Sequence, residues 1–196
     1  MTPLVMIRHG PTEWNQEKRL QGHTDVRLSD EGREIVSRWQ VPPPFNQFHW
    51  VCSPLLRARE TAVLLGAQDP EIEPRLKEMN YGSWEGSRLD DLRRDLGEEL
   101  AENEARGIDF RPEGGERPRE VQERLKSWLR DIAWHKRPTV AVSHNGVLRA
   151  LYSLATGWSM AGPPPEKLQW GAMHCFHVAD NGQVSVVRIN ISIAPK

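Results

Sequence analysis

The feature that most constrains the fold is a short apolar run that recurs three times, each time directly before a polar loop. The runs are residues 4–7, residues 48–52 and residues 139–142. The loops after them begin at Arg8, Ser53 and Ser143. Short apolar runs bounded in this way are typical of strands that are buried on both faces of a sheet. The sequence therefore predicts three central strands that end in polar side chains.

Helical periodicity follows each of these loops, with apolar residues spaced three and four apart. Ile35, Val36 and Trp39 follow the first loop, residues 55–65 the second, and residues 147–154 the third. Strands that alternate with helices indicate an α/β fold, a three-layer sandwich in which helices cover both faces of a mostly parallel central sheet. We expect a hairpin at the sheet edge, formed by residues 172–178 and residues 184–191.

The start of the second helix has a local signal of its own. Ser53 is a good N-cap and Pro54 a good first helical residue, so the sequence predicts a helix from Pro54 with Arg57 in its first turn.

The 196 residues contain no repeat or long linker, so we expect a single domain over residues 1–196. Leucines at 89, 92, 96 and 100 predict one amphipathic helix, and Val121, Leu125, Leu129 and Ile132 predict another. We interpret residues 81–116 as a helical excursion over the active site, placed as a lid would be.

The charges nearly cancel, with 26 basic and 27 acidic residues and a formal net charge of -1. This balance gives no general attraction to nucleic acid or to an anionic membrane. We expect residues 1–7 to form neither a signal peptide nor a membrane span. The chain has two cysteines, and His174 and His177 would fall on opposite faces of a strand, so we predict no metal site. We expect a cytoplasmic protein without a cofactor, and a homodimer is one of the oligomeric states left open.

Cationic and imidazole side chains follow the three predicted strands: Arg8 and His9, then Arg57, then His144. Ligands of open α/β sheets bind beyond the carboxyl ends of the strands, where these side chains should meet. Two guanidiniums, with backbone amides near Gly10, suit a dianion that offers three acceptor oxygens. The pattern therefore predicts a phosphate site.

His9 can be both neutral and nucleophilic near pH 7, because two guanidiniums should lower its pKa. His144 can donate a hydrogen bond to a phosphoryl oxygen. Glu78 is the best candidate for the acid that protonates the leaving oxygen, since a carboxyl beside phosphate and apolar rings should have a raised pKa. Glu13 and Glu85 are rival carboxylates.

Four motifs, in order along nearly the whole chain, carry a resemblance to a known family. They are residues 8–15, residues 53–61, residues 78–86 and residues 143–146. Together they resemble the histidine phosphatase superfamily in its phosphoglycerate mutase-like branch. The resemblance implies a metal-independent enzyme in which His9 is phosphorylated and Glu78 is the proton donor. It implies that the phosphoryl group is held by Arg8, Asn15, Arg57 and His144.

The resemblance also implies further contacts near the site, with the substrate or its phosphate group. These are Thr12, Gln21, Gly22 and Asn145. Trp14 and Trp84 lie within the motifs and can line the pocket, and His23 follows directly after the Gln21-Gly22 pair. The other histidines are interpreted as structural or surface residues.

One departure from the family pattern favours hydrolysis over phosphoryl transfer. The true mutases carry an arginine directly after the acid and have a longer excursion, whereas Met79 occupies that position here. We therefore expect a phosphomonoesterase that acts on a small phosphorylated metabolite. Phosphoglycerate mutase is the second hypothesis, because arginines between 88 and 117 can supply basic contacts. A phosphate-binding or phosphoprotein-binding module without turnover is the third.

Overall fold

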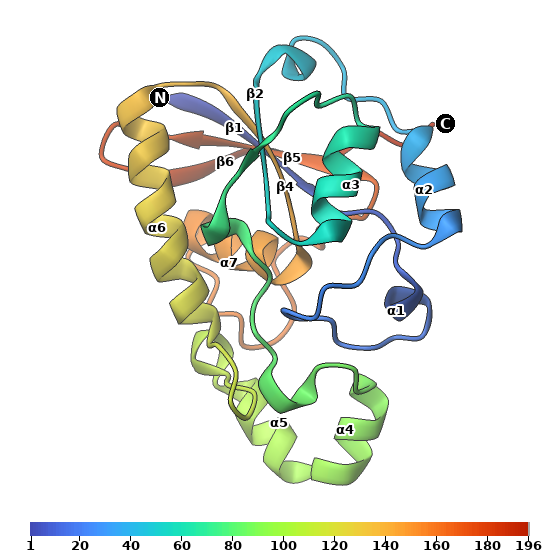
Figure 1. Cartoon of the computed structure of the whole chain (residues 1–196). Coiled ribbons are helices and arrows are strands. Elements are labelled where there is room, and N and C mark those ends of the chain that lie inside the picture. The colour runs from blue at the N-terminus through green and yellow to red at the C-terminus, as the bar shows by residue number, and fades with distance from the viewer. Residues whose placement is uncertain (196) are drawn as a thin grey trace.

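A six-stranded sheet with the strand order β3-β2-β4-β1-β5-β6 runs through the computed structural model, which describes residues 1–195 (Figure 1). The strands are β1 (Thr2–Arg8), β2 (His49–Cys52), β3 (Glu71–Ile72), β4 (Thr139–Ser143), β5 (Ala172–Val178) and β6 (Val184–Ser192). The first four are parallel, whereas β5 is antiparallel to β1 and β6 is antiparallel to β5. The mostly parallel sheet and the hairpin at its edge are confirmed. The predicted domain of residues 1–196 ends one residue beyond the described part.

Helices cover both faces of the sheet, so the three-layer α/β fold is also confirmed (Figure 1). Side chains of β1 alternate between the two layers because successive residues of a strand point to opposite faces. Leu4 and Met6 pack with α6 (Pro118–His135) and α7 (Asn145–Thr156), whereas Val5 and Ile7 pack with α2 (Asp30–Ser37) and α3 (Leu56–Leu64). Burying one such side chain fully contributes about 1.5–3 kcal/mol relative to exposure.

The start of α3 differs from the prediction. The helix begins at Leu56, with Leu55 as its N-cap, and Pro54 is not helical. The Ser53 hydroxyl contacts His144 Nε2 at 2.6 Å and accepts a hydrogen bond from the Leu55 amide at 3.3 Å. The side chain that was expected to cap the helix therefore hydrogen-bonds to a histidine of another loop. Arg57 still lies in the first turn, as predicted.

The excursion between β3 and β4 contains two helices where one was predicted. They are α4 (Leu89–Leu96) and α5 (Glu98–Ala105), and Gly97 interrupts them with φ +51° and ψ -118°. Only glycine adopts such a conformation readily, and it ends the helical hydrogen bonding. Both helices lie at the lower end of the molecule in Figure 1, beyond the sheet.

The remaining elements are short. They are α1 (Glu13–Gln16) and the 3-10 turns Phe45–Gln47, Pro74–Leu76, Gly82–Trp84 and Gly107–Asp109. None of the helices in residues 1–195 is long and apolar enough to cross a membrane.

Candidate active site

Pairing between strands brings the predicted site residues together at one edge of the sheet. Arg8 of β1 lies opposite Ser143 of β4, and the His9 amide continues the ladder by donating to the Ser143 carbonyl at 2.9 Å. The His9 and His144 rings that follow lie 5.2 Å apart between centroids. On the other side of β4, the Ser53 hydroxyl contacts His144. The three loops therefore meet, as the sequence predicted.

His9 is held in the form that a nucleophile needs. The residue is 3% exposed, and its Nδ1 lies 2.7 Å from the Gly10 carbonyl oxygen. A carbonyl can only accept, so we assign the proton to Nδ1, which leaves the Nε2 lone pair free. Burial, then the charges of Arg8 and Arg57, hold the pKa of His9 well below its usual value. The imidazole is therefore neutral near pH 7.

The guanidinium of Arg57 is fully buried, and its hydrogen bonds within residues 1–195 go to backbone carbonyls and to no carboxylate. It donates to the Gly22 carbonyl at 2.8 Å and to the Thr24 carbonyl at 3.0 Å. The Nε atoms of Arg8 and Arg57 are buried and have no hydrogen-bond partner among residues 1–195. A buried charged donor without an acceptor is costly, so these two side chains indicate a place for an anion.

His144 offers a further donor to the same anion. It is fully buried, and burial, followed by the charges of Arg57 and His9, holds its pKa well below the usual value. Because Nε2 faces the Ser53 hydroxyl, it can accept that O–H. Nδ1 is then the N–H, and within the described chain it is buried without a partner.

Glu78 lies next to this cluster, against the first turn of α7. Its Oε1 accepts from the Met79 amide at 2.8 Å and its Oε2 from the Gly146 amide at 3.3 Å. A Cβ at position 146 would lie 2.6 Å from Glu78 Oε1, so only glycine allows this approach. The carboxyl of Glu78 therefore contacts Gly146, which follows His144 by two positions in the chain.

The rival carboxylates have other surroundings. Glu13 is exposed in α1. Glu85 accepts hydrogen bonds from the amides of His23, Thr24 and Tyr81 and from the Thr24 hydroxyl. Glu85 thus stabilises the loop whose carbonyls accept hydrogen bonds from Arg57. Of the three carboxylates, Glu78 is the best placed to act as an acid.

The other predicted contacts lie around the same edge. Thr12 and Asn15 form a capping box at α1, in which Asn15 Oδ1 accepts from the Thr12 amide and hydroxyl, both at 3.0 Å. The Gln21 side-chain oxygen is buried and has no partner in the described chain. Asn145 is the first residue of α7. His23 Nε2 lies 2.8 Å from the Glu78 carbonyl oxygen.

Trp170 is a positioning residue that the sequence did not predict. Its indole N–H donates to the His9 carbonyl at 2.8 Å, and the Arg8 guanidinium lies 5.1 Å from the centre of its ring. It therefore supports both Arg8 and His9 from the loop before β5. No periodicity or spacing in the sequence marks it.

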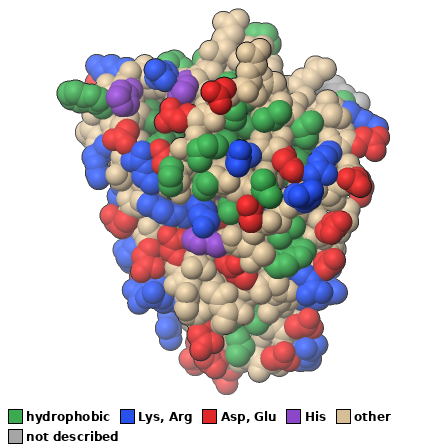
Figure 2. Space-filling model, viewed as in Figure 1, with side chains coloured by type: hydrophobic (Ala, Val, Ile, Leu, Met, Phe, Trp, Pro, Cys, Tyr) green, Lys and Arg blue, Asp and Glu red, His purple; other side chains and the backbone are tan. Residues whose placement is uncertain are grey.

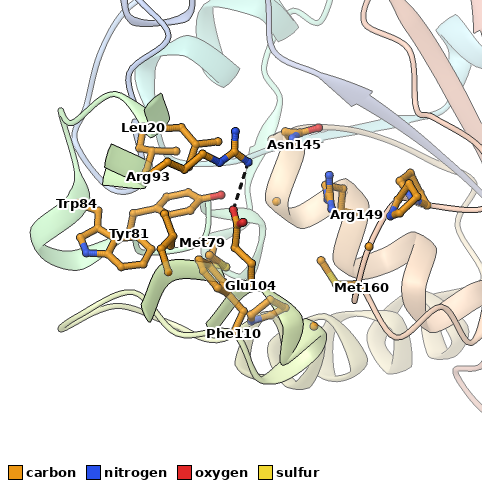
Figure 3. Close-up of a pocket in the computed structure, with 18 residues that line it drawn as sticks. Leu20, Met79, Tyr81, Trp84, Arg93, Glu104, Phe110, Asn145, Arg149 and Met160 are labelled. Carbon is orange, nitrogen blue, oxygen red and sulfur yellow. Dashed lines mark hydrogen bonds and ion pairs between the residues drawn. The ribbon is translucent and has the colours of Figure 1, made fainter. Parts of the chain in front are cut away.

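A cavity of about 450 Å³ opens between the excursion and α7 (Figure 3), and its wall includes Met79 and Gly146, the two residues whose amides donate to Glu78. Its wall includes Met79, Tyr81, Phe110, Asn145 and Arg149. A cavity of this size suits a small organic molecule. Figure 2 shows acidic and basic side chains intermixed over the face of the molecule seen in Figure 1. Residues 1–195 contain no group of three or more His, Cys, Asp or Glu side chains that could hold a metal ion.

Known proteins are similar to this chain over most of its length. The sequence pattern of the histidine phosphatase superfamily (branch 1) matches residues 4–192. A glucosyl-3-phosphoglycerate phosphatase of Mycolicibacterium vanbaalenii is 36% identical over 169 residues, which cover 79% of this chain and 74% of the relative. Phosphoglycerate mutase-like protein 4 of Arabidopsis thaliana is 33% identical over 163 residues, covering 78% and 70%. The solved mycobacterial glucosyl-3-phosphoglycerate phosphatase in complex with VO3 is similar over the full length of both chains, with 26% identity and a TM-score of 0.76.

Proposed function

The chain belongs to the histidine phosphatase superfamily, and we propose that it is a metal-independent phosphomonoesterase that works through a phosphohistidine on His9. The observation that carries the proposal is the state of His9: a buried, neutral imidazole with its Nδ1 proton held by Gly10, beside two guanidiniums whose Nε groups have no partner in the described part of the chain. That arrangement suits attack on the phosphorus of a bound phosphate ester.

The first half of the reaction transfers the phosphoryl group to the enzyme. Arg8, Arg57 and His144 donate to the phosphoryl oxygens and offset the charge that they carry in the transition state. His9 Nε2 forms the bond to phosphorus while the bond to the ester oxygen breaks. Glu78 gives its proton to that oxygen, so the alcohol leaves neutral.

The second half returns the enzyme to its starting state. The Glu78 carboxylate takes a proton from a water molecule, and the water oxygen attacks the phosphorus. The phosphorus–nitrogen bond breaks, its electron pair returns to His9 Nε2, and phosphate leaves. Asn15, Thr12, Gln21, Gly22 and Asn145 are proposed as further contacts to the phosphate group or the substrate.

The names of the relatives favour hydrolysis over the mutase reaction, because the similar proteins include glucosyl-3-phosphoglycerate phosphatases. A phosphoglycerate mutase is the second candidate, since other relatives are named phosphoglycerate mutase or phosphoglycerate mutase-like protein. Met79, buried in the cavity wall directly after Glu78, favours the phosphatase. It places an apolar side chain where the mutase pattern has a cation. A coupled assay for interconversion of 3- and 2-phosphoglycerate, with and without bisphosphoglycerate, separates the two.

We further propose that residues 1–196 act as one domain, with residues 81–116 covering the substrate. A cytoplasmic location is supported by Cys52 and Cys175, which are both free thiols.

The direct test is release of inorganic phosphate from phenyl phosphate. His9→Ala should abolish it, EDTA should leave it unchanged, and His135→Ala, at an exposed histidine at the end of α6, should match the wild type. Full activity of His9→Ala, or a requirement for a divalent metal, would refute the proposal.

A further inference from the structure

Arg149 is a charged side chain in the cavity wall for which the proposed chemistry gives no role. It projects from α7 with Asn145, while Tyr81, Arg93 and Glu104 face them from the excursion (Figure 3). Its guanidinium lies 5.0 Å from the centre of the Trp158 ring. That ring supports the flat face of the guanidinium and leaves its N–H groups at the edge for another partner.

The cavity carries three charged side chains, and two of them neutralise each other. Arg93 donates to Glu104 at 3.5 Å. Arg149 has no carboxylate partner within the described chain. Burial lowers the pKa of its guanidinium, and the nearby Tyr81 opposes this shift. The cavity is therefore left with one uncompensated positive charge, partly removed from water.

Arg149 is placed to meet the part of the substrate that leaves. Gly146 on the first turn of α7 contacts Glu78, the proposed proton donor to the leaving oxygen. Arg149 follows Gly146 by three residues on the same helix, so both lie on one side of it at a spacing of about one turn, roughly 5 Å. A leaving alcohol that starts at Glu78 and runs along α7 reaches Arg149 after a few bonds.

The apolar side chains of the cavity strengthen an interaction between the Arg149 guanidinium and an anion. Met79, Phe110 and Met160 contribute apolar side chains to the wall of the cavity that Arg149 also lines. Charges attract one another more strongly where such groups exclude water. A guanidinium presents paired N–H groups that match the two oxygens of a carboxylate or the oxygens of a second phosphate.

We propose that Arg149 determines specificity by binding an acidic group on the alcohol portion of the substrate, so that the enzyme prefers phosphomonoesters with a second negative charge. This inference rests on the proposed phosphatase function. It names the chemical class of the leaving alcohol: one that carries an acid a few bonds from the ester oxygen.

The test compares matched esters that differ in the acid alone. 3-Phosphoglycerate is paired with glycerol 3-phosphate, and 4-carboxyphenyl phosphate with phenyl phosphate. For each pair the ratio of kcat/KM, acidic ester over neutral ester, is measured. The wild type should show a ratio of at least about tenfold, the effect expected of one charge-assisted hydrogen-bonded pair. Arg149→Met should bring the ratio near one, and Arg149→Lys should retain part of it.

Arg94→Met is the matched control, because Arg94 is an exposed arginine of α4 that pairs with Asp91 and Asp95 outside the cavity wall. Its ratio should equal that of the wild type. A wild-type ratio near one in both pairs, or an unchanged ratio in Arg149→Met, overturns the proposal. If Arg149→Met lowered kcat/KM equally for both esters of a pair, Arg149 would have a structural role, and the proposal would be overturned as well.

Binding separates this proposal from the proposed function. The dissociation constants of 3-phosphoglycerate and glycerol 3-phosphate are measured by calorimetry with His9→Ala, which lacks the nucleophile. Tighter binding of the acid that disappears in His9→Ala/Arg149→Met supports the acid site even if no ester is hydrolysed, in which case the phosphatase function alone fails. Equal binding of the two ligands contradicts the acid site whatever the turnover.

Discussion

Replacing Glu85 with Gln should weaken the support of Arg57, although the two side chains are joined only through the loop between them. The Glu85 carboxylate accepts four hydrogen bonds, of 2.6 to 3.3 Å, from the amides of His23, Thr24 and Tyr81 and the hydroxyl of Thr24. The carbonyls of Gly22 and Thr24 in this loop accept the two hydrogen bonds of the Arg57 guanidinium. The carboxylate therefore positions the carbonyls, and the carbonyls position the guanidinium.

The size of the effect follows from the number of acceptors lost. Hydrogen bonds to a charged group contribute about 1.5–3 kcal/mol each, and Gln keeps one neutral acceptor oxygen. Allowing for the partial exposure of Glu85, Glu85→Gln should lower the free energy of unfolding by about 2 kcal/mol at pH 7. A shift of Arg57 by a fraction of an ångström should lower kcat/KM by about tenfold to a hundredfold.

The effect on stability should depend on pH in a defined direction. Burial favours the neutral carboxyl of Glu85, but the hydrogen bonds from Thr24, His23 and Tyr81 outweigh it, so the pKa lies below its ordinary value of 4.5. A lowered pKa in the folded state stabilises the protein fully above the ordinary value. That contribution is lost as the pH falls through the folded-state pKa. The stability difference between wild type and Glu85→Gln should therefore shrink in acid.

Urea denaturation at pH 7 and at pH values below 4.5 measures this difference, and phosphate release measures the loss of activity. Glu102→Gln is the control, because Glu102 is exposed on α5. A stability difference that is the same at both pH values, or unchanged kcat/KM in Glu85→Gln, would refute the reasoning.

Three further predictions concern the groups that react. Gly146→Ala places a Cβ 2.6 Å from Glu78 Oε1 and should lower kcat for alkyl phosphates by at least about tenfold, without a comparable loss of thermal stability. Glu78→Gln should lower phosphate release from alkyl esters by about 10²–10⁴-fold but much less from 4-nitrophenyl phosphate, whose alcohol leaves without a proton; equal losses would contradict the acid role. Because the pKa of His9 is lowered, kcat/KM should not begin to fall at pH 6.5 but only well below it, and a pH profile with a break at 6.5 would show that His9 titrates normally.

The strand-end residues were predictable because their signals are local. Arg8, His9 and His144 lie within two residues of the ends of apolar runs, and parallel strands place such ends together. Arg57 needs only the first turn of the next helix. Each of these predictions required only that a strand be recognised, that its end be located, and that the residue type at that end be known.

Features that depend on contacts across the fold were missed. Trp170 reaches His9 and Arg8 from the loop before β5, and nothing near it in the sequence indicates this. The two residues of β3 are exposed at the sheet edge and show no apolar run. The helical spacing of the leucines continues through Gly97, although the backbone turns there. Ser53 has the chemistry of an N-cap, but its hydroxyl is taken by a histidine from another loop.

The central claim is that a phosphoryl group becomes attached to His9 during turnover. Rapid acid-free quenching of the enzyme with substrate, followed by mass spectrometry of its peptides, measures this directly. We expect one phosphoryl group on the peptide that contains His9, labile in acid and stable in base. It should be present in Glu78→Gln with 4-nitrophenyl phosphate and absent in His9→Ala. Turnover without a phosphorylated peptide, or with the phosphoryl group on another residue, would contradict it.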